Sequence, residues 1–119
     1  MFGARELRKK NEMLHQFHWG LTDEELIYDL KCNHSHDDIR YDKDWGLIIP
    51  LIQKIIRNHE DEVVNVKQNL PKEVTVTFEL DLDTLLYDFE FSYVLSKDVS
   101  EVFEKVVELV QILKDNKLW

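Results

Sequence analysis

The stretch EVTVTFELDLDTLLYDFEFSYV, residues 73–94, decides the fold because apolar and polar side chains alternate along it twice. A period of two residues is that of a half-buried β-strand. The apolar side chains share one face of the extended chain, and they are Val74, Val76, Phe78, Leu80, Tyr87, Phe89, Phe91 and Tyr93. The pattern therefore predicts two antiparallel strands with one apolar face and one polar, acidic face.

The register of this hairpin depends on the length of its loop. A two-residue loop at Asp83–Thr84 places Glu79 opposite Asp88. A four-residue loop at 81–84 places Glu79 opposite Leu86 instead. Two like charges directly across a ladder cost roughly a few tenths of a kcal/mol, so the sequence favours the four-residue loop.

Helices are predicted ahead of the hairpin. Apolar residues spaced by seven and three predict one helix over residues 4–17. Thr22, with Glu25 three residues further on, forms a capping box that begins a second helix. Two N-terminal helices are therefore expected, with a break between them at Gly20.

A third helix is predicted from about residue 44 to 59, with Asp44 or Asp42 as its N-cap. Apolar residues recur at helical spacing through this segment, although Pro50 lies inside it and removes one backbone hydrogen bond. Residues 63–69 form a candidate edge strand between this helix and the hairpin.

The last predicted element is a helix that is capped by Ser96 or Asp98 and runs to about residue 116. Antiparallel strands followed by a helix that must cover their aromatic face make an α+β domain. We therefore predict a single domain, residues 1–119, of the α+β class. It is a small two-layer domain in which an antiparallel β-hairpin or three-stranded sheet packs against helices, in the order α-α-α-(β)-β-β-α.

The composition limits the classes of partner. A formal net charge of −9 repels phosphate backbones and favours basic partners, so direct binding of nucleic acid is not expected. The longest uncharged apolar run, Trp45 to Ile52, is far shorter than the ~20 residues that span a bilayer, so no membrane association is expected. Cys32 is the single cysteine and no apolar segment follows the basic N-terminus, which indicates the cytoplasm.

Acidic residues concentrate on the predicted hairpin, and those of the candidate binding face are Glu79, Asp81, Asp83, Asp88 and Glu90. No Lys or Arg occurs between Glu73 and Lys97. Such a face is either a solvated sheet surface or a surface that meets a basic protein surface, including a groove that normally holds nucleic acid. General acid–base catalysis would require a cleft and raised pKa values, which the sequence does not indicate.

The stretch KCNHSHDD, residues 31–38, is the candidate metal site. Cys32, His34 and His36 lie on one side of an extended segment, but no second pair of ligands follows at short spacing. The site would need a further ligand from Asp37, Asp38, His15, His18 or His59. No glycine-rich turn supplies an oxyanion hole for a cysteine nucleophile. The favoured interpretation is a solvated loop whose histidines face water, with no cofactor and no catalytic residue.

Other residues near the chain ends suggest further surfaces. His15 and His18 are expected to cover an edge of the core at the end of the first helix. Trp19, Leu118 and Trp119 are expected to lie outside the main core. Exposed aromatic residues often mark interfaces, so a homodimer is an alternative.

Two segments resemble small uncharacterised proteins that are common in phage and prophage genomes. Their pattern is a Tyr shortly before a W-x-x-L-x-P-V-x-x-I helix and, after a pair of strands, a V-V-E-F-I helix. The matching positions here are Tyr41, Trp45, Pro50, Leu51, Ile55, Phe103, Val106, Val107, Glu108, Leu109 and Val110. The chain departs from the pattern where Gly46 and Leu47 follow the Trp. The group offers no catalytic residues to transfer, so the resemblance implies a phage accessory protein and no reaction.

The acidity and the resemblance together favour a non-catalytic binding protein. The hypothesis is a phage-encoded accessory protein or inhibitor that docks on a host or phage protein with a basic surface, for example as an anti-defence factor. The alternatives are a metal-binding protein that uses Cys32, His34 and His36, and a structural homodimer.

Overall fold

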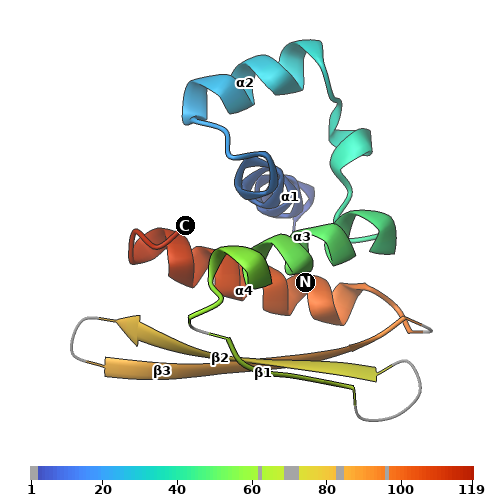
Figure 1. Ribbon diagram of the computed structural model, residues 1–119. Helices are drawn as coiled ribbons and strands as arrows, with labels where there is room; N and C mark the ends of the chain where they lie inside the picture. Colours follow the sequence, from blue (N-terminus) through green and yellow to red (C-terminus); the bar gives the residue numbers. More distant parts are fainter. Residues whose placement is uncertain (1–2, 62, 69–72, 83–84, 96) are drawn as a thin grey trace.

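The predicted hairpin is present in the computed structural model, and a third strand joins it in an antiparallel sheet with helices on one side (Figure 1). The elements in chain order are α1 (Ala4–Trp19), α2 (Asp23–Cys32), a short 3-10 helix η1 (His36–Ile39), α3 (Trp45–Asn58), β1 (Val63–Gln68), β2 (Glu73–Leu82), β3 (Leu85–Val94) and α4 (Ser100–Asp115). The structure describes residues 3–61, 63–68, 73–82, 85–95 and 97–119. The α+β class, the order of the elements and the edge strand are confirmed.

The strand order is β1-β2-β3, so β2 is the central strand and both its neighbours are edges. The buried side chains of β2 and β3 all lie on the inner face, and they are Val76, Phe78, Leu80, Phe89 and Phe91. The rings of Phe78, Phe89 and Phe91 pack together, with centroids 6.2–6.4 Å apart for the contacts that Phe91 makes. Burial of each such side chain contributes about 1.5–3 kcal/mol to the stability of the fold. The inner face of the sheet is therefore one side of the hydrophobic core.

The register of the hairpin differs from the prediction. Glu79 pairs with Asp88 and not with Leu86. The two strands remain paired as far as Leu82 and Leu85, which face each other, so the predicted four-residue loop is wrong.

The physical reason lies in the polar face of the hairpin. In the observed register Thr77 Oγ1 donates a hydrogen bond to the Glu90 carboxylate at 3.2 Å, and the hydroxyls of Thr75 and Ser92 are bonded at 2.7 Å. The like-charged carboxylates are exposed, so water screens their repulsion. A screened repulsion of tenths of a kcal/mol is smaller than two cross-strand hydrogen bonds at about 1 kcal/mol each.

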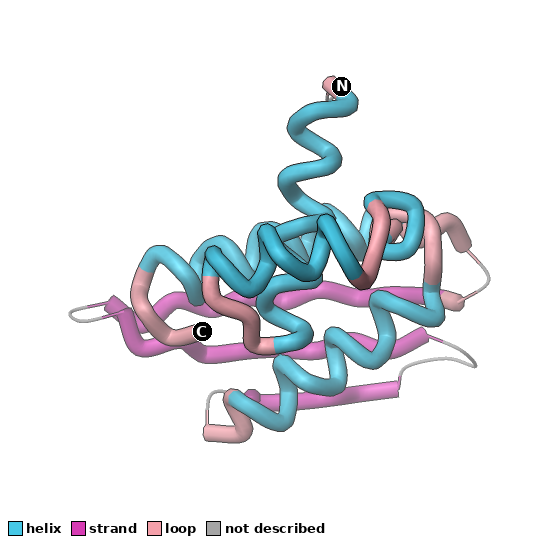
Figure 2. The backbone as a smooth tube through the Cα atoms, turned by 90° about the horizontal axis from the view of Figure 1, so that it is seen from above, coloured by secondary structure: helices cyan, strands magenta, loops and turns pink. Residues whose placement is uncertain are grey.

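The described helices lie on the inner side of the sheet (Figure 1), and seen from above they lie over the strands (Figure 2). Helices α3 and α4 lie next to the strands, and α1 and α2 lie further from them within the helical layer. The buried apolar residues of α3 and α4 recur at the predicted helical spacing, and they are Ile48, Leu51, Ile52, Ile55, Val102, Phe103, Val106, Val107, Leu109, Val110 and Leu113. Leu14 and Phe17 of α1 close the core from the other side. The opposite face of the sheet has no helix over it among the described elements.

Helix α3 begins where the sequence predicts. Asp44 is its N-cap, and Asp44 Oδ1 accepts a hydrogen bond from the backbone N–H of Gly46 at 2.8 Å. The helix continues through Pro50, whose side chain is exposed. Burial of its apolar stripe therefore outweighs the loss of one backbone hydrogen bond.

The other predicted helix starts are also present. Thr22 Oγ1 accepts from the backbone N–H of Glu25 at 3.2 Å, and the Glu25 carboxylate accepts from the backbone N–H of Thr22 at 3.0 Å, which completes the capping box of α2. The N-cap of α4 is Val99 and not the predicted Asp98, which lies one residue earlier. Asp98 Oδ1 still accepts a hydrogen bond from the backbone N–H of Ser100 at 2.9 Å. Ser96, the alternative cap, lies outside the described residues.

The segment between α2 and α3 folds onto α1 through polar contacts. Asn11 Nδ2 donates to Asp42 Oδ1 at 2.9 Å, and Arg40 donates two hydrogen bonds of 2.8 Å to the same carboxylate. The Arg40 guanidinium holds the pKa of Asp42 below its usual value. Tyr41 is buried, and its hydroxyl lies 2.8 Å from His18 Nδ1.

The protonation states at this last contact follow from burial. Desolvation lowers the pKa of His18, and the positive charge of Lys54 lowers it further. Desolvation raises the pKa of Tyr41. The Tyr41 hydroxyl therefore keeps its proton and donates a hydrogen bond to Nδ1 of a neutral His18 ring.

Replacement of the buried hydroxyl tests this contact. Tyr41→Phe keeps the ring and removes the donor, so we expect the free energy of unfolding to fall by about 1 kcal/mol. Tyr28→Phe is the matched control because Tyr28 is 64% exposed. Urea unfolding measures both variants. Equal stability of the two variants would show that the Tyr41–His18 bond contributes nothing.

The lowered pKa of His18 also predicts a dependence of stability on pH. An unfolded chain takes up a proton at His18 near the ordinary pKa of 6.5, whereas the folded protein resists protonation until a lower pH. Stability is therefore expected to fall as the pH drops below 6.5 toward the lowered value. Urea unfolding above and below this pH should show a smaller loss in His18→Gln than in the wild type. A loss of the same size in both proteins would assign the effect to other groups.

Candidate functional site

The outer face of the sheet carries the predicted acidic residues. Glu79, Asp88 and Glu90 are all exposed on this face, which we call the acidic face. Asp81 belongs to β2, but its side chain lies outside the described part of the chain, and Asp83 lies outside the described residues altogether. The predicted grouping on one face is therefore established for three of the five carboxylates.

The centre of the acidic face combines charge with an apolar side chain. Glu79 and Asp88 face each other directly across the β2–β3 ladder, so two negative charges are held side by side. Leu86, which shares this face, is 62% exposed. An exposed leucine beside opposed carboxylates is an arrangement that a partner with both apolar and cationic groups can contact.

The acidity continues around the free edge of β3. A groove of about 540 Å³ lies between this edge and α4, and its lining includes Glu90, Glu101, Glu104, Lys105 and Glu108. Lys105 also lies over the ring of Phe89, at 6.0 Å from its centroid. The groove extends the negative surface from the sheet to the neighbouring helix.

The structure does not bring the predicted metal ligands Cys32, His34 and His36 together. Cys32 is the last residue of α2, and its side chain is exposed. His36 begins η1, and its Nδ1 lies 3.5 Å from a carboxylate oxygen of Glu12. Of the described residues, these three form no common group of ligand atoms.

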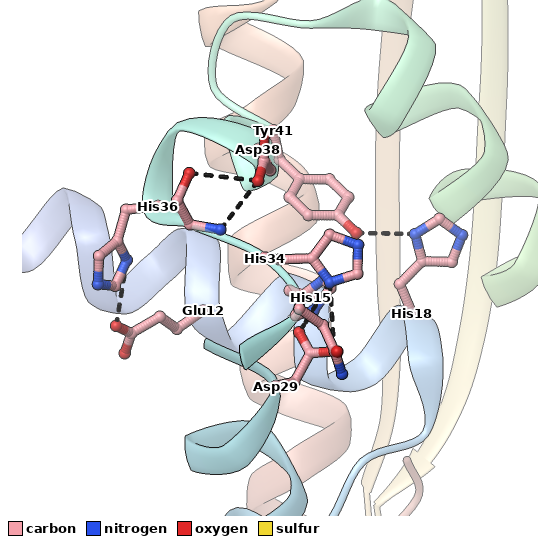
Figure 3. A network of polar contacts seen from close by, with 10 residues as sticks. Glu12, His15, His18, Asp29, His34, His36, Asp38 and Tyr41 are labelled. Atoms are coloured by element: carbon pink, nitrogen blue, oxygen red, sulfur yellow. Dashed lines mark hydrogen bonds and ion pairs between the residues drawn. The ribbon is translucent and has the colours of Figure 1, made fainter. Parts of the chain in front are cut away.

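His34 instead joins two residues from α1 and α2 (Figure 3). His15 Nε2 lies 2.7 Å from Asp29 Oδ2, and His34 Nδ1 lies 3.0 Å from the same oxygen and 3.2 Å from Oδ1. The rings of His15 and His34 meet edge to face, with centroids 5.2 Å apart. The expectation that the histidines face water holds only in part for His34, whose side chain is 40% exposed but is held against Asp29.

The three residues of this cluster differ in exposure. The exposed fraction of the side chain is 2% for His15, 15% for Asp29 and 40% for His34. Burial by itself raises the pKa of Asp29, but hydrogen bonds from His15, His34 and Asn33 outweigh that effect and hold the pKa below its usual value. Asp29 is therefore an ionised carboxylate between two imidazoles.

Asp29 was not predicted from the sequence. Asp29 lies seven residues after Thr22, and His15 lies seven residues before Thr22, so the two residues are equally far in sequence from the start of α2. This symmetry is the one signal that could have suggested the contact. It is weak because a sequence does not give the angle at which two helices meet.

His15 and His18, which were predicted to cover a core edge together, have different partners. His15 is buried against Asp29, whereas His18 is held by Tyr41. Both contacts tie α1 to the segment that follows it. The expectation that these residues cover the edge of the core is consistent with their burial.

The predicted exposed residues at the chain ends fall into two groups. Trp19 is 61% exposed and Trp119 is 39% exposed, with the ring of Trp119 packed 5.8 Å from that of Phe17. Leu118 packs against the core, so the expectation that it lies outside the core is wrong. Of the three residues on which the homodimer hypothesis rests, Trp19 is therefore the most exposed.

Comparisons with protein-family models, with curated proteins and with solved structures found no match to this chain. None of the described helices has both the length and the apolar character that crossing a membrane requires. The function is therefore argued from the acidic face and the His15–Asp29–His34 cluster.

The observed register predicts the effect of charge reversal on stability. Glu79→Lys and Asp88→Lys each place opposite charges across the ladder, so each is expected to raise the free energy of unfolding by about 0.2–1 kcal/mol. The double variant places two lysines opposite each other, and its stability should fall below the sum of the two single gains. Urea unfolding measures all three variants.

Asp37→Lys is the matched control because it changes the net charge equally at an exposed position outside the sheet. Glu79→Lys should be more stable than this control. If Glu79→Lys and Asp37→Lys gain equally, the effect comes from net charge and the pairing of Glu79 with Asp88 has no energetic consequence.

Proposed function

We propose that this protein is a non-catalytic binding protein that docks its acidic face on a basic surface of another protein. The observation that carries the proposal is the pairing of Glu79 with Asp88 on a sheet face that no described helix covers. Two exposed carboxylates opposite each other repel, and a cationic side chain placed between them removes that repulsion. The repulsion between Glu79 and Asp88 in the free protein is therefore relieved when a basic partner binds.

The surroundings of the pair support a protein partner over a simple cation. Leu86 is exposed beside the carboxylates and offers an apolar contact that a small ion cannot use. Thr75, Thr77 and Ser92 line the same face with hydroxyl groups. Protein interfaces typically combine an apolar centre with polar groups around it.

The negative groove beside β3 enlarges the surface that a partner can contact. Its lining holds four carboxylates, from β3 and α4, beside the cationic Lys105, so negative charge predominates around this edge of the sheet. Complementary charge of this kind increases the association rate and selects against acidic partners. A basic protein surface is the partner that this charge distribution favours.

Basic protein surfaces occur where proteins bind nucleic acid. A strongly acidic protein is repelled by phosphate backbones, yet it is attracted to the basic groove of a protein that binds them. The resemblance to phage proteins makes a host protein with such a groove the partner we expect. By covering the groove, the protein would act as an inhibitor.

Charge reversal of the acidic face tests this proposal. The wild type, immobilised at low salt, is expected to capture a basic protein from host lysate, and the affinity for the purified partner is expected to fall as salt is added. The triple variant Glu79→Lys/Asp88→Lys/Glu90→Lys should bind at least about tenfold more weakly, because the partner then meets like charges. Biolayer interferometry with the purified partner measures both proteins.

A second triple variant is the control. Glu24→Lys/Asp37→Lys/Asp115→Lys changes the net charge by the same amount at exposed positions on α2, η1 and α4. It should keep most of the affinity. Equal loss in both triple variants would indicate attraction by net charge alone, and unchanged binding after reversal of the acidic face would reject the proposed docking surface.

A further inference from the structure

We propose that His15, Asp29 and His34 bind one zinc-type divalent cation at the junction of α1 and α2. This site is separate from the acidic face, because the sheet lies on the far side of α3 and α4 (Figures 1 and 3). The candidate ligand atoms are His15 Nε2, a carboxylate oxygen of Asp29 and His34 Nδ1, and all lie within 4.8 Å of one another. They come from α1, from α2 and from the turn that follows α2.

The donor set is chemically suited to zinc. Two imidazole nitrogens and one carboxylate oxygen are a set that zinc takes in sites with three protein ligands, where water or another molecule fills the fourth position. Calcium and magnesium prefer sites built from oxygen atoms alone, so a site with two imidazoles disfavours them. The chemistry therefore indicates zinc or a neighbouring transition metal.

The geometry requires only small movements. Zinc bonds nitrogen and carboxylate oxygen at about 2.0–2.2 Å, so two donors of a tetrahedral ion lie roughly 3.3–3.5 Å apart. The distances from Asp29 Oδ2 to His15 Nε2 and to His34 Nδ1 are 2.7 Å and 3.0 Å. Opening the cluster by about half an ångström admits the ion, and each ring then carries its proton on the nitrogen that faces away.

The ligands are held in place by their local structure. His15 is buried in the body of α1, and Asp29 lies in the last turns of α2. His34 is fixed because its backbone N–H donates to the backbone carbonyl of Asp29 at 2.9 Å. Ligands that are already positioned lose little freedom on binding, which favours affinity.

The exposure of the three ligands increases from His15 to His34, which gives a cation access to the cluster from solvent. His15 lies at the closed end of the cluster, and His34, whose side chain is 40% exposed, lies at the open end. The ring of Trp19, which is 61% exposed, lies 6.4 Å from that of His15. An ion can therefore enter beside His34 and keep one coordination position toward solvent.

The position of the cluster gives metal binding a structural consequence. None of the residues of α2 is fully buried, although Leu30 packs against the core, so polar contacts contribute to the attachment of this helix to α1. These contacts include the bond from Gln16 Nε2 to Asp23 Oδ1 at 2.9 Å and the His15–Asp29–His34 cluster. A cation bound by all three ligands would tie the C-terminal end of α2 to α1, and the energy of binding would add to the stability of the fold.

Titration of tag-free protein with zinc chloride tests the site. Isothermal titration calorimetry should show one zinc ion per chain, and the melting temperature should rise by about 5 °C or more at saturating zinc and return with EDTA. Asp29→Asn and His34→Gln should each weaken zinc binding at least about tenfold, because each removes one of three ligands. Both side chains are partly exposed, and circular dichroism checks that each variant is folded.

Cys32→Ser and His36→Gln are the matched controls, since both residues lie in the same histidine-rich segment but outside the cluster. Zinc affinity should be unchanged in both. The histidine ring resonances of His15 and His34, observed by NMR, should shift on zinc addition while that of His36 stays in place. The site is rejected if the wild type binds no zinc at millimolar concentration, or if binding survives in Asp29→Asn and His34→Gln and is lost in either control.

Discussion

The structure depends on covering the aromatic inner face of the β2–β3 hairpin. Phe78, Phe89 and Phe91 would expose a large apolar surface on an isolated hairpin, which is at best marginally stable in water. Helices α3 and α4 supply the opposing surface with residues that are almost completely buried. Since all the described helices gather on this side, the other face of the sheet must be polar to remain in water. The polar character of this face is a consequence of the one-sided core, whereas its negative charge is a separate feature of the sequence.

The core weakens with distance from the sheet. Helix α1 still contributes Leu14 and Phe17, but α2 contributes no buried residue. The outer part of the helical layer is instead held by polar contacts that involve His15, His18 and Tyr41. Polar contacts of this kind stabilise by about 1 kcal/mol each, so α2 is the helix that opens at the lowest cost. A ligand that binds there has the largest effect on local stability.

The two candidate surfaces lie at opposite ends of the molecule. The acidic face is on the outer side of the sheet, whereas the His15–Asp29–His34 cluster is at the junction of the helices furthest from it (Figure 1). The apolar core lies between the two sites. A partner docked on the sheet therefore leaves the cluster accessible, because it contacts the opposite side of the molecule.

The sequence by itself determined the strands, the helices and the face on which each side chain lies, because these follow from spacing and capping within a few residues. Alternation fixed the inner position of Phe78, and the spacing of Thr22 and Glu25 fixed the start of α2. Only the tertiary structure decided the register and the contact of His15 with Asp29. Both registers bury the same apolar side chains. The observed one is favoured because hydroxyl groups pair across the strands and water screens the repulsion between Glu79 and Asp88. The angle between two helices depends on the packing of the whole core, which no local pattern contains.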